Sequence, residues 1–189
     1  MNNPYDRCPI SSLDFEVKIL PKTAISHIWS FDISDVTVKP GQTITATTTI
    51  ESYLTGHKTY KTAIKIPENT PPGNYKIIAG GIDEYMQFVT NAAPYKYTPE
   101  NLSSLISIVN NIGNVQTNNL YIILTVPPGG IAIENAELPE LPLSKALLLD
   151  SKKRSLPTKP AVKWLEEKIP VGTIVLDARS LDITVEEKK

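Results

Sequence analysis

The sequence predicts a mainly β protein, in which an N-terminal immunoglobulin-like β-sandwich is followed by a smaller α+β half with one clear helix. Two runs rich in β-branched residues, 36–38 and 42–50, flank a Pro40-Gly41 turn. The second run alternates threonine with small or apolar residues, as a half-buried strand does. A proline-rich turn at 67–75 then precedes the run 76–80. Short strands with turns about every ten residues are typical of a sandwich.

Alternating patterns predict further strands in the first half. We expect residues 14–20 and 24–32 to form a hairpin that opens the sandwich. Residues 57–66 and 84–90 also alternate polar with apolar side chains, and we expect each to be a strand.

The predicted helix begins after Thr98, which is suited to the N-cap position. Pro99 would occupy the first helical position, Glu100 would lie near the positive end of the helix dipole, and Gly113 would end the helix. One face of this helix is apolar, and we expect it to be buried. Its residues recur at spacings of three and four: Leu102, Leu105, Ile106, Val109 and Ile112.

The second half contains the most continuous apolar run of the chain, residues 119–126, which predicts a buried central strand. Prolines 139 and 142 exclude a helix before about residue 143, and a short helix is expected at 144–150. Residues 162–169 and 173–185 are expected to be two closing strands.

The alternating pattern breaks between residues 91 and 98, which predicts a domain boundary there. Residues 1–95 would form the sandwich, and residues 96–189 would form the α+β domain.

Composition is that of an ordinary globular protein. The 189 residues are 41% hydrophobic and 21% charged, and 19 Lys and Arg balance 20 Asp and Glu. This balance gives no electrostatic reason to expect nucleic acid as a partner, and no apolar run is long enough to insert into a membrane. With a single cysteine, Cys8, and no apolar leader, the chain as written is expected to be soluble and cytoplasmic. A processed or excised fragment would leave the compartment open.

The sequence shows no motif for catalysis, for a cofactor or for a metal. Its two histidines, His27 and His57, lie outside any metal-binding spacing, and no serine occupies a Gly-x-Ser-x-Gly motif. The pairs Gly80-Gly81 and Gly129-Gly130 belong to neither common phosphate-loop motif. We therefore expect neither an enzyme nor a cofactor-binding protein.

Strand edges are the predicted interaction sites. Residues 43–50 and 57–66 alternate cleanly and are bordered by turns, so both are candidate edges for adding a strand from another chain. The lysines at 58, 61 and 65 would equally serve to prevent uncontrolled pairing, and the pattern does not separate these roles. The candidate contact residues are Thr43, Thr45, Thr47, Lys58, Tyr60, Thr62 and Trp164.

The order of segments also resembles a known arrangement. The matching segments are residues 24–32, 36–44, 66–75, 100–106, 118–124 and 137–144. Together they resemble the non-catalytic region C-terminal to the peptidase in bacterial SpoIVB-type serine peptidase-like proteins, over most of residues 14–185. The peptidase of that family uses a serine in a Gly-Asp-Ser-Gly-like motif with a histidine upstream. This chain has no such motif, so the resemblance implies a non-catalytic module and transfers no catalytic residue.

These observations predict a non-enzymatic interaction or scaffold protein that binds a protein partner or itself. It could be an accessory subunit that promotes assembly, as a filament or tubule, of a larger bacterial multiprotein enzyme complex. One alternative is a module that positions a substrate for a serine peptidase. A third alternative is a sandwich that binds a small molecule or carbohydrate. It is weaker than the others, because the sequence shows no clustered polar and aromatic site.

Overall fold

The computed structural model of the chain is mainly β. It describes residues 5, 11–17, 19, 24–53, 56–126, 130–133, 136–139, 158–160 and 162–187. The helix expected at 144–150 lies outside these residues.

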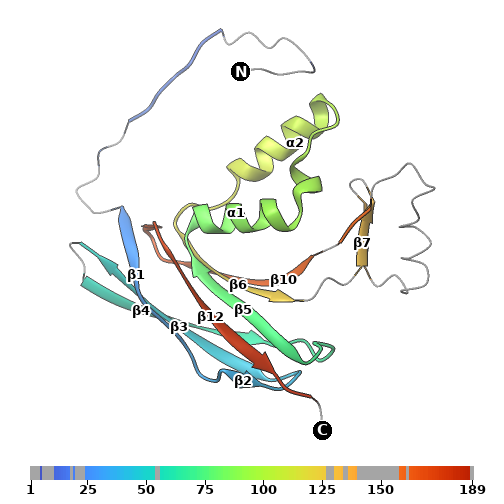
Figure 1. Cartoon of the computed structure of the whole chain (residues 1–189). Coiled ribbons are helices and arrows are strands. Elements are labelled where there is room, and N and C mark those ends of the chain that lie inside the picture. The colour runs from blue at the N-terminus through green and yellow to red at the C-terminus, as the bar shows by residue number, and fades with distance from the viewer. Residues whose placement is uncertain are drawn as a thin grey trace.

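The first sheet has four strands in the order β11-β1-β3-β4 (Figure 1). Its strands are β1 (Ile25–Ile33), β3 (Thr43–Ser52), β4 (Gly56–Lys65) and β11 (Ile174–Val175). The pairs β1–β3 and β3–β4 are antiparallel, whereas β11 pairs with β1 in parallel.

The second sheet has five strands in the order β10-β6-β5-β12-β2. Its strands are β2 (Thr37–Val38), β5 (Gly73–Gly80), β6 (Asn119–Val126), β10 (Lys163–Pro170) and β12 (Ala178–Val185). A separate three-stranded sheet consists of β7 (Gly130–Ile133), β8 (Ala136–Pro139) and β9 (Thr158–Pro160).

The two larger sheets pack face to face in a sandwich-like arrangement around one apolar core. Along β3, burial alternates strictly: Ile44, Ala46, Thr48 and Ile50 are buried, while Thr43, Thr45, Thr47 and Thr49 face outward. Ile77 of β5 belongs to the same core from the opposite sheet. The predicted alternating strand at 42–50 is thus confirmed.

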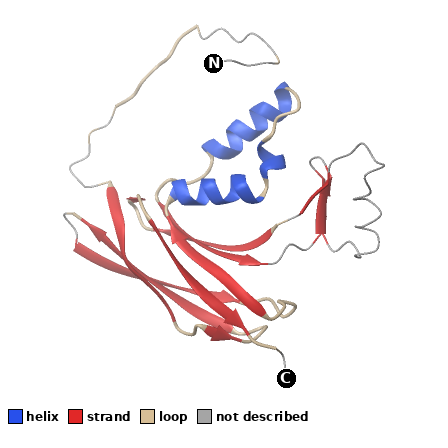
Figure 2. Cartoon of the chain, in the orientation of Figure 1, coloured by secondary structure: helices blue, strands red, loops and turns tan. Residues whose placement is uncertain are grey.

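The strand β6 is buried along most of its length, as the sequence predicts. Leu120, Ile122 and Leu124 face the sandwich core, whereas Tyr121 and Ile123 face the other side of the sheet. Helix α1 (Ile82–Ala92) covers that outer side (Figure 2).

The strand expected at 84–90 is wrong, because these residues belong to α1. Ile82, Tyr85, Met86 and Val89 follow helical spacing and pack on the outer face of β6. The alternation of polar and apolar residues in this short run is compatible with both periods, and the apolar face of the sheet selects the helix.

The expected helix is α2 (Leu102–Gly113), but its N-cap is Asn101 rather than Thr98. The amide of Ser104 donates to Asn101 Oδ1 (2.9 Å), and the amide of Asn101 donates to Ser104 Oγ (3.0 Å). This reciprocal pair is a capping box. Residues Pro94–Tyr97 form a short 3-10 helix before it.

The apolar face of α2 is not buried, which contradicts the prediction. None of its residues is buried, and Val109 is 58% exposed. Figure 2 shows α2 leading away from the sheets, so no sheet lies under its apolar stripe.

Strand pairing crosses the boundary expected near residue 95. In one sheet β5 pairs with β6 and β12, and in the other β1 pairs with β11. The region expected as one strand at 173–185 is divided between β11 and β12, which belong to different sheets. The hairpin expected from 14–20 and 24–32 is also wrong, since residues 11–17 and 19 are in no strand.

The exposure of α2 leads to a stability prediction. We expect Val109→Ala to change the free energy of unfolding by less than about 0.5 kcal/mol, because it removes exposed methyl groups. The matched control Ile77→Ala removes a buried side chain of the core and should cost about 2 to 5 kcal/mol. Urea denaturation measures both values, and a loss above about 2 kcal/mol for Val109→Ala would show that the stripe is covered in solution.

Candidate interaction surface

The first predicted edge, at residues 43–50, is not an edge. Strand β3 is paired with β1 on one side and with β4 on the other. The side chains of Thr43, Thr45 and Thr47 point to the outer face of the sheet, but the backbone groups of Thr45 and Thr47 are already engaged with β1 and Ser34. β-branched alternation describes a half-buried strand equally well at the centre of a sheet and at its edge.

The second predicted edge is confirmed, since β4 is the last strand of its sheet among the described residues. The predicted contact residues Lys58, Tyr60 and Thr62 lie on it. In the register they stand opposite the buried residues Ile50, Thr48 and Ala46 of β3. Because paired residues share a face, these three side chains point toward the inner side of the sandwich.

Backbone hydrogen bonds show which groups of β4 are free. The amide of Ile66 donates to the carbonyl of Gln42 (2.8 Å), and the carbonyl of Ile66 accepts from Gly41 (3.0 Å). Every second residue of an antiparallel strand points its backbone the same way, so the even-numbered residues of β4 bond to β3. The odd-numbered residues point their N–H and C=O groups outward: His57, Thr59, Lys61, Ala63 and Lys65.

This alternation decides where a proline could test the free edge of β4. A proline at Thr62 would remove a hydrogen bond to β3 and damage the sheet itself. A proline at Ala63 would remove only an outward donor.

The side of the sandwich where the edge strands β4 and β10 meet leaves part of the apolar core accessible. The strand β10, at the edge of the second sheet, contacts β4, and the Tyr60 hydroxyl donates to the carbonyl of Val171 at 3.4 Å. Tyr60, Leu165 and Ile169 pack against the core but are only partly buried. Apolar surface is therefore accessible where the two edge strands meet.

The exposed aromatic residue of this sheet is Trp29, which the sequence reasoning missed. It is 62% exposed, and its ring lies 4.8 Å from the ring of His57. His57 Nε2 lies 3.6 Å from Glu51 Oε1. A bulge between Ile28 and Ser30 shifts the register of β1, and this irregularity has no clear signal in the sequence.

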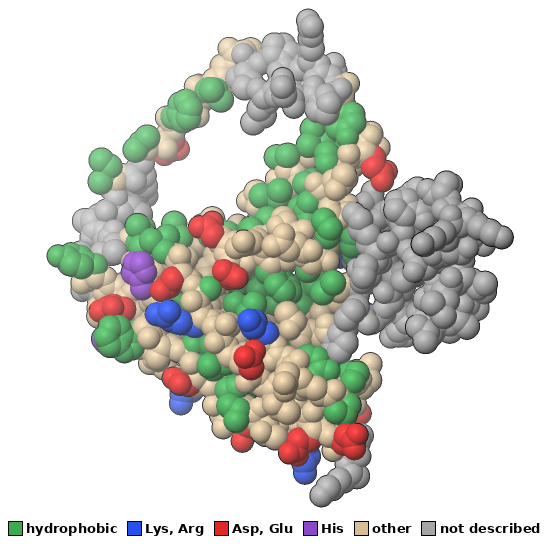
Figure 3. Space-filling model, in the orientation of Figure 1, with side chains coloured by type: hydrophobic (Ala, Val, Ile, Leu, Met, Phe, Trp, Pro, Cys, Tyr) green, Lys and Arg blue, Asp and Glu red, His purple; other side chains and the backbone are tan. Residues whose placement is uncertain are grey.

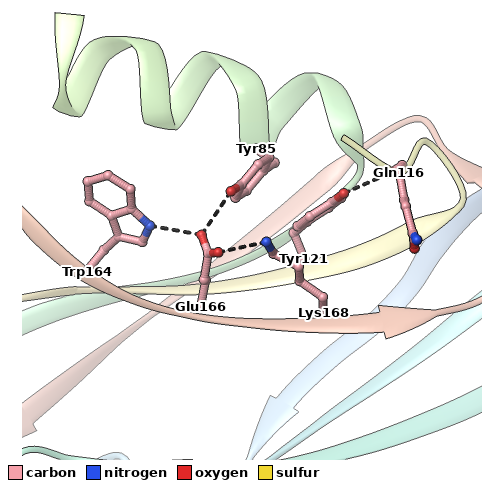
Figure 4. A network of polar contacts seen from close by, with 6 residues as sticks. All are labelled: Tyr85, Gln116, Tyr121, Trp164, Glu166 and Lys168. Carbon is pink, nitrogen blue, oxygen red and sulfur yellow. Dashed lines mark hydrogen bonds and ion pairs between the residues drawn. The ribbon is translucent and has the colours of Figure 1, made fainter. Parts of the chain in front are cut away.

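Trp164, the remaining predicted contact residue, makes its contacts within the molecule. Its indole N–H donates to Glu166 Oε2 (3.0 Å), and its ring meets Phe88 edge-on at 5.6 Å. Figure 4 shows Glu166 as the common acceptor of Trp164, Tyr85 and Lys168. Tyr85 donates at 3.0 Å, and the Lys168 ammonium lies 2.8 Å from the other carboxylate oxygen.

These contacts shift two pKa values in opposite directions. Burial and the hydrogen bond to Glu166 raise the pKa of the Tyr85 hydroxyl. Burial alone would raise the pKa of Glu166, but hydrogen bonds from Lys168, Trp164 and Tyr85 lower it below its usual value. The carboxylate therefore ties α1 to β10 as an ionised group.

An open pocket of about 430 Å³ lies at the end of β6 nearest α2. Asn111, Asn114, Gln116, Asn119, Tyr121 and Lys168 are among its lining residues. The Oδ1 atom of buried Asn119 has no hydrogen-bond partner among the described residues. This cluster of amides beside an aromatic ring was not visible in the sequence, because its members come from α2, the following loop, β6 and β10.

The part of the chain that the structure describes contains no group of three or more His, Cys, Asp or Glu residues that could hold a metal ion. Within the same residues, every helix is too short or too polar to cross a membrane. Comparison of the chain with protein families, with curated proteins and with solved structures found no match.

The Glu166 contacts predict a pH-dependent contribution to stability. Glu166→Gln should cost about 1 to 3 kcal/mol at neutral pH, because it removes the charge that three donors share. The folded-state pKa of Glu166 lies below the unfolded value of about 4.5, so this contribution is complete above that pH and is lost as the pH falls through the folded-state pKa.

Urea denaturation of the wild type and Glu166→Gln at neutral pH and near pH 3 measures this, and the difference should shrink at the lower pH. The control is Glu167→Gln, which changes an exposed carboxylate on the opposite face of the same strand. An equal loss at both pH values would contradict the role of the charge.

Proposed function

We propose that this chain is a non-enzymatic interaction module that binds another protein chain by accepting a strand at the free edge of β4. The observation that carries the proposal is the outward row of backbone N–H and C=O groups on alternate residues of this ten-residue strand. Such a row is a template for one more antiparallel strand.

The other edges of the two sheets are less suited to this role. The strands β2 and β11 have two residues each, and a strand that short offers too few groups for pairing. The strand β10 ends in Pro170, and Trp164 and Glu166 hold it against α1. Strand β4 is the longest of the four and contains no proline.

Charge on β4 favours one kind of incoming strand. Lys61 and Lys65 are exposed on the outer face of β4, and two β4 strands from different copies would bring these like charges together. A strand with acidic residues on its outer face would instead complement them. The lysines thus oppose β4–β4 pairing and select an acidic partner strand.

A module of this kind fits a scaffold or accessory subunit that promotes assembly of a larger complex. The immunoglobulin-like connectivity stays a prediction, and the binding mode requires only packed sheets with a free edge. A substrate-positioning module for a serine peptidase also stays a prediction, since its support is the sequence resemblance.

The proposal predicts that Ala63→Pro weakens binding at least about tenfold, because it removes one outward donor and disturbs the neighbouring pairs. Sedimentation velocity of the purified chain, and binding of partners isolated with it, measure the effect. Ala63→Ser keeps the donor and is the matched control. Both variants must keep the wild-type circular dichroism spectrum, and unchanged association of a folded Ala63→Pro variant would refute the proposal.

The pocket favours a second candidate function, binding of a small neutral molecule rich in hydroxyl or amide groups. Its volume lies in the range of small-molecule sites, and the exposed side chains of Asn111, Asn114 and Gln116 bring amide groups to its lining. Neutral and N-acetylated monosaccharides are suitable probes in a thermal-shift assay. We expect a shift that Asn111→Ala reduces, and the absence of a shift with every sugar would reject this candidate.

A further inference from the structure

Residues 11–17 and 19 form an extended arm that precedes β1 and belongs to no strand. Apolar side chains alternate along it: Leu13, Phe15, Val17 and Ile19 are between 67% and 91% exposed. Figure 3 shows hydrophobic side chains standing out along the arm. An alternating apolar segment left fully exposed has the pattern of a half-buried strand without its sheet.

The arm leads away from the sheets of its own molecule. Figure 1 shows it passing from β1 toward α2. At its far end the Tyr5 hydroxyl donates to the carbonyl of Pro99, just before α2. In this structure the arm does not pair with the β4 edge of the same chain.

The arm and the β4 edge have complementary patterns. If Glu16 stands opposite Lys61 in an antiparallel pair, Leu13 stands opposite Ile64, Phe15 opposite Thr62 and Val17 opposite Tyr60. The apolar residues of the arm then face the inner side of the sandwich, beside the partly buried margin of Tyr60, Leu165 and Ile169.

The same register also pairs backbone hydrogen-bonding groups and places opposite charges near each other. Asp14 and Glu16 stand opposite Ala63 and Lys61, which are residues with outward N–H and C=O groups. Their carboxylates lie on the outer face, where Lys61 and Lys65 are exposed. The acidic strand that β4 selects is thus present in the chain itself.

We infer that the arm of one copy, residues 13–17 with Ile19, adds as an antiparallel strand to the β4 edge of a second copy. This inference rests on the proposed function and names the partner strand. The contact joins two different surfaces, so each copy that receives an arm still has its own arm to offer, and the contact can be repeated from copy to copy.

Cross-linking between copies tests the register directly. In a Cys8→Ser background, one preparation carries Phe15→Cys and the other carries Thr62→Cys. These positions form a non-hydrogen-bonded pair in the proposed register, where side chains approach most closely. Mixing under mild oxidation should give a covalent dimer, whereas Phe15→Cys mixed with Thr45→Cys should not, because Thr45 lies on a central strand.

A non-covalent measurement accompanies the cross-link. Phe15→Asp should weaken self-association by about tenfold to a hundredfold in sedimentation velocity, because the buried ring is replaced by a charge. Val36→Asp is the matched control, since it places the same charge on an exposed apolar residue outside the arm. It should leave association unchanged.

The outcomes separate this inference from the proposed function. A mixed cross-link together with loss of association in Phe15→Asp supports both. If Ala63→Pro weakens association while Phe15→Asp has no effect and no mixed dimer forms, the arm is not the partner strand and the proposed function stands. A disulfide that forms only within a chain carrying both Phe15→Cys and Thr62→Cys overturns pairing between copies. If neither Ala63→Pro nor Phe15→Asp changes association, both fail.

Discussion

Burial of β6 on both of its faces is the constraint on which the other elements depend. Leu120, Ile122 and Leu124 require the opposing sheet, and Tyr121 and Ile123 require a second layer on the other side. No run of side chains this apolar is stable with one face in water, because each large apolar side chain left exposed forgoes about 1.5 to 3 kcal/mol. The α1 layer follows from this need, and so does the position of β6 between β5 and β10.

The join between β5 and α1 shows how little space that arrangement leaves. A Cβ atom built on Gly81 would overlap the carbonyl oxygen of Val175, so the helix begins where only a glycine lets β11 approach. Glu166 holds β10 to α1 through its hydrogen bond with Tyr85 (Figure 4), and the ring of Trp164 meets Phe88 of α1. These contacts fix the second sheet and one face of the molecule.

Among the residues that the structure describes, no layer covers the outer face of the first sheet, and we propose its free edge as an interaction surface. Its outer face carries threonines, lysines and the exposed Trp29, and its last strand, β4, points every second backbone pair outward. Helix α2 and the arm add further exposed apolar stripes. Apolar area of this kind costs free energy in water, and occupation by another chain would recover it. In the association that we propose, the positive charge of β4 and the acidic residues of the arm would favour pairing between these two different segments.

The sequence by itself determined the mainly β class, the β3 and β6 strands, the end of α2 and β4 as a candidate edge, because alternation, continuous apolar runs and turn residues act over a few neighbouring positions. Only the tertiary structure decided that 84–90 is a helix, that β3 is central and that Trp164 is bonded within the molecule while Trp29 is exposed. It also showed that each of the two larger sheets contains strands from both sides of residue 95. The physical reason is that an apolar face specifies burial but not the surface that buries it. Pairing between strands far apart in the chain, such as β1 with β11, supplies that surface only after the whole chain has folded.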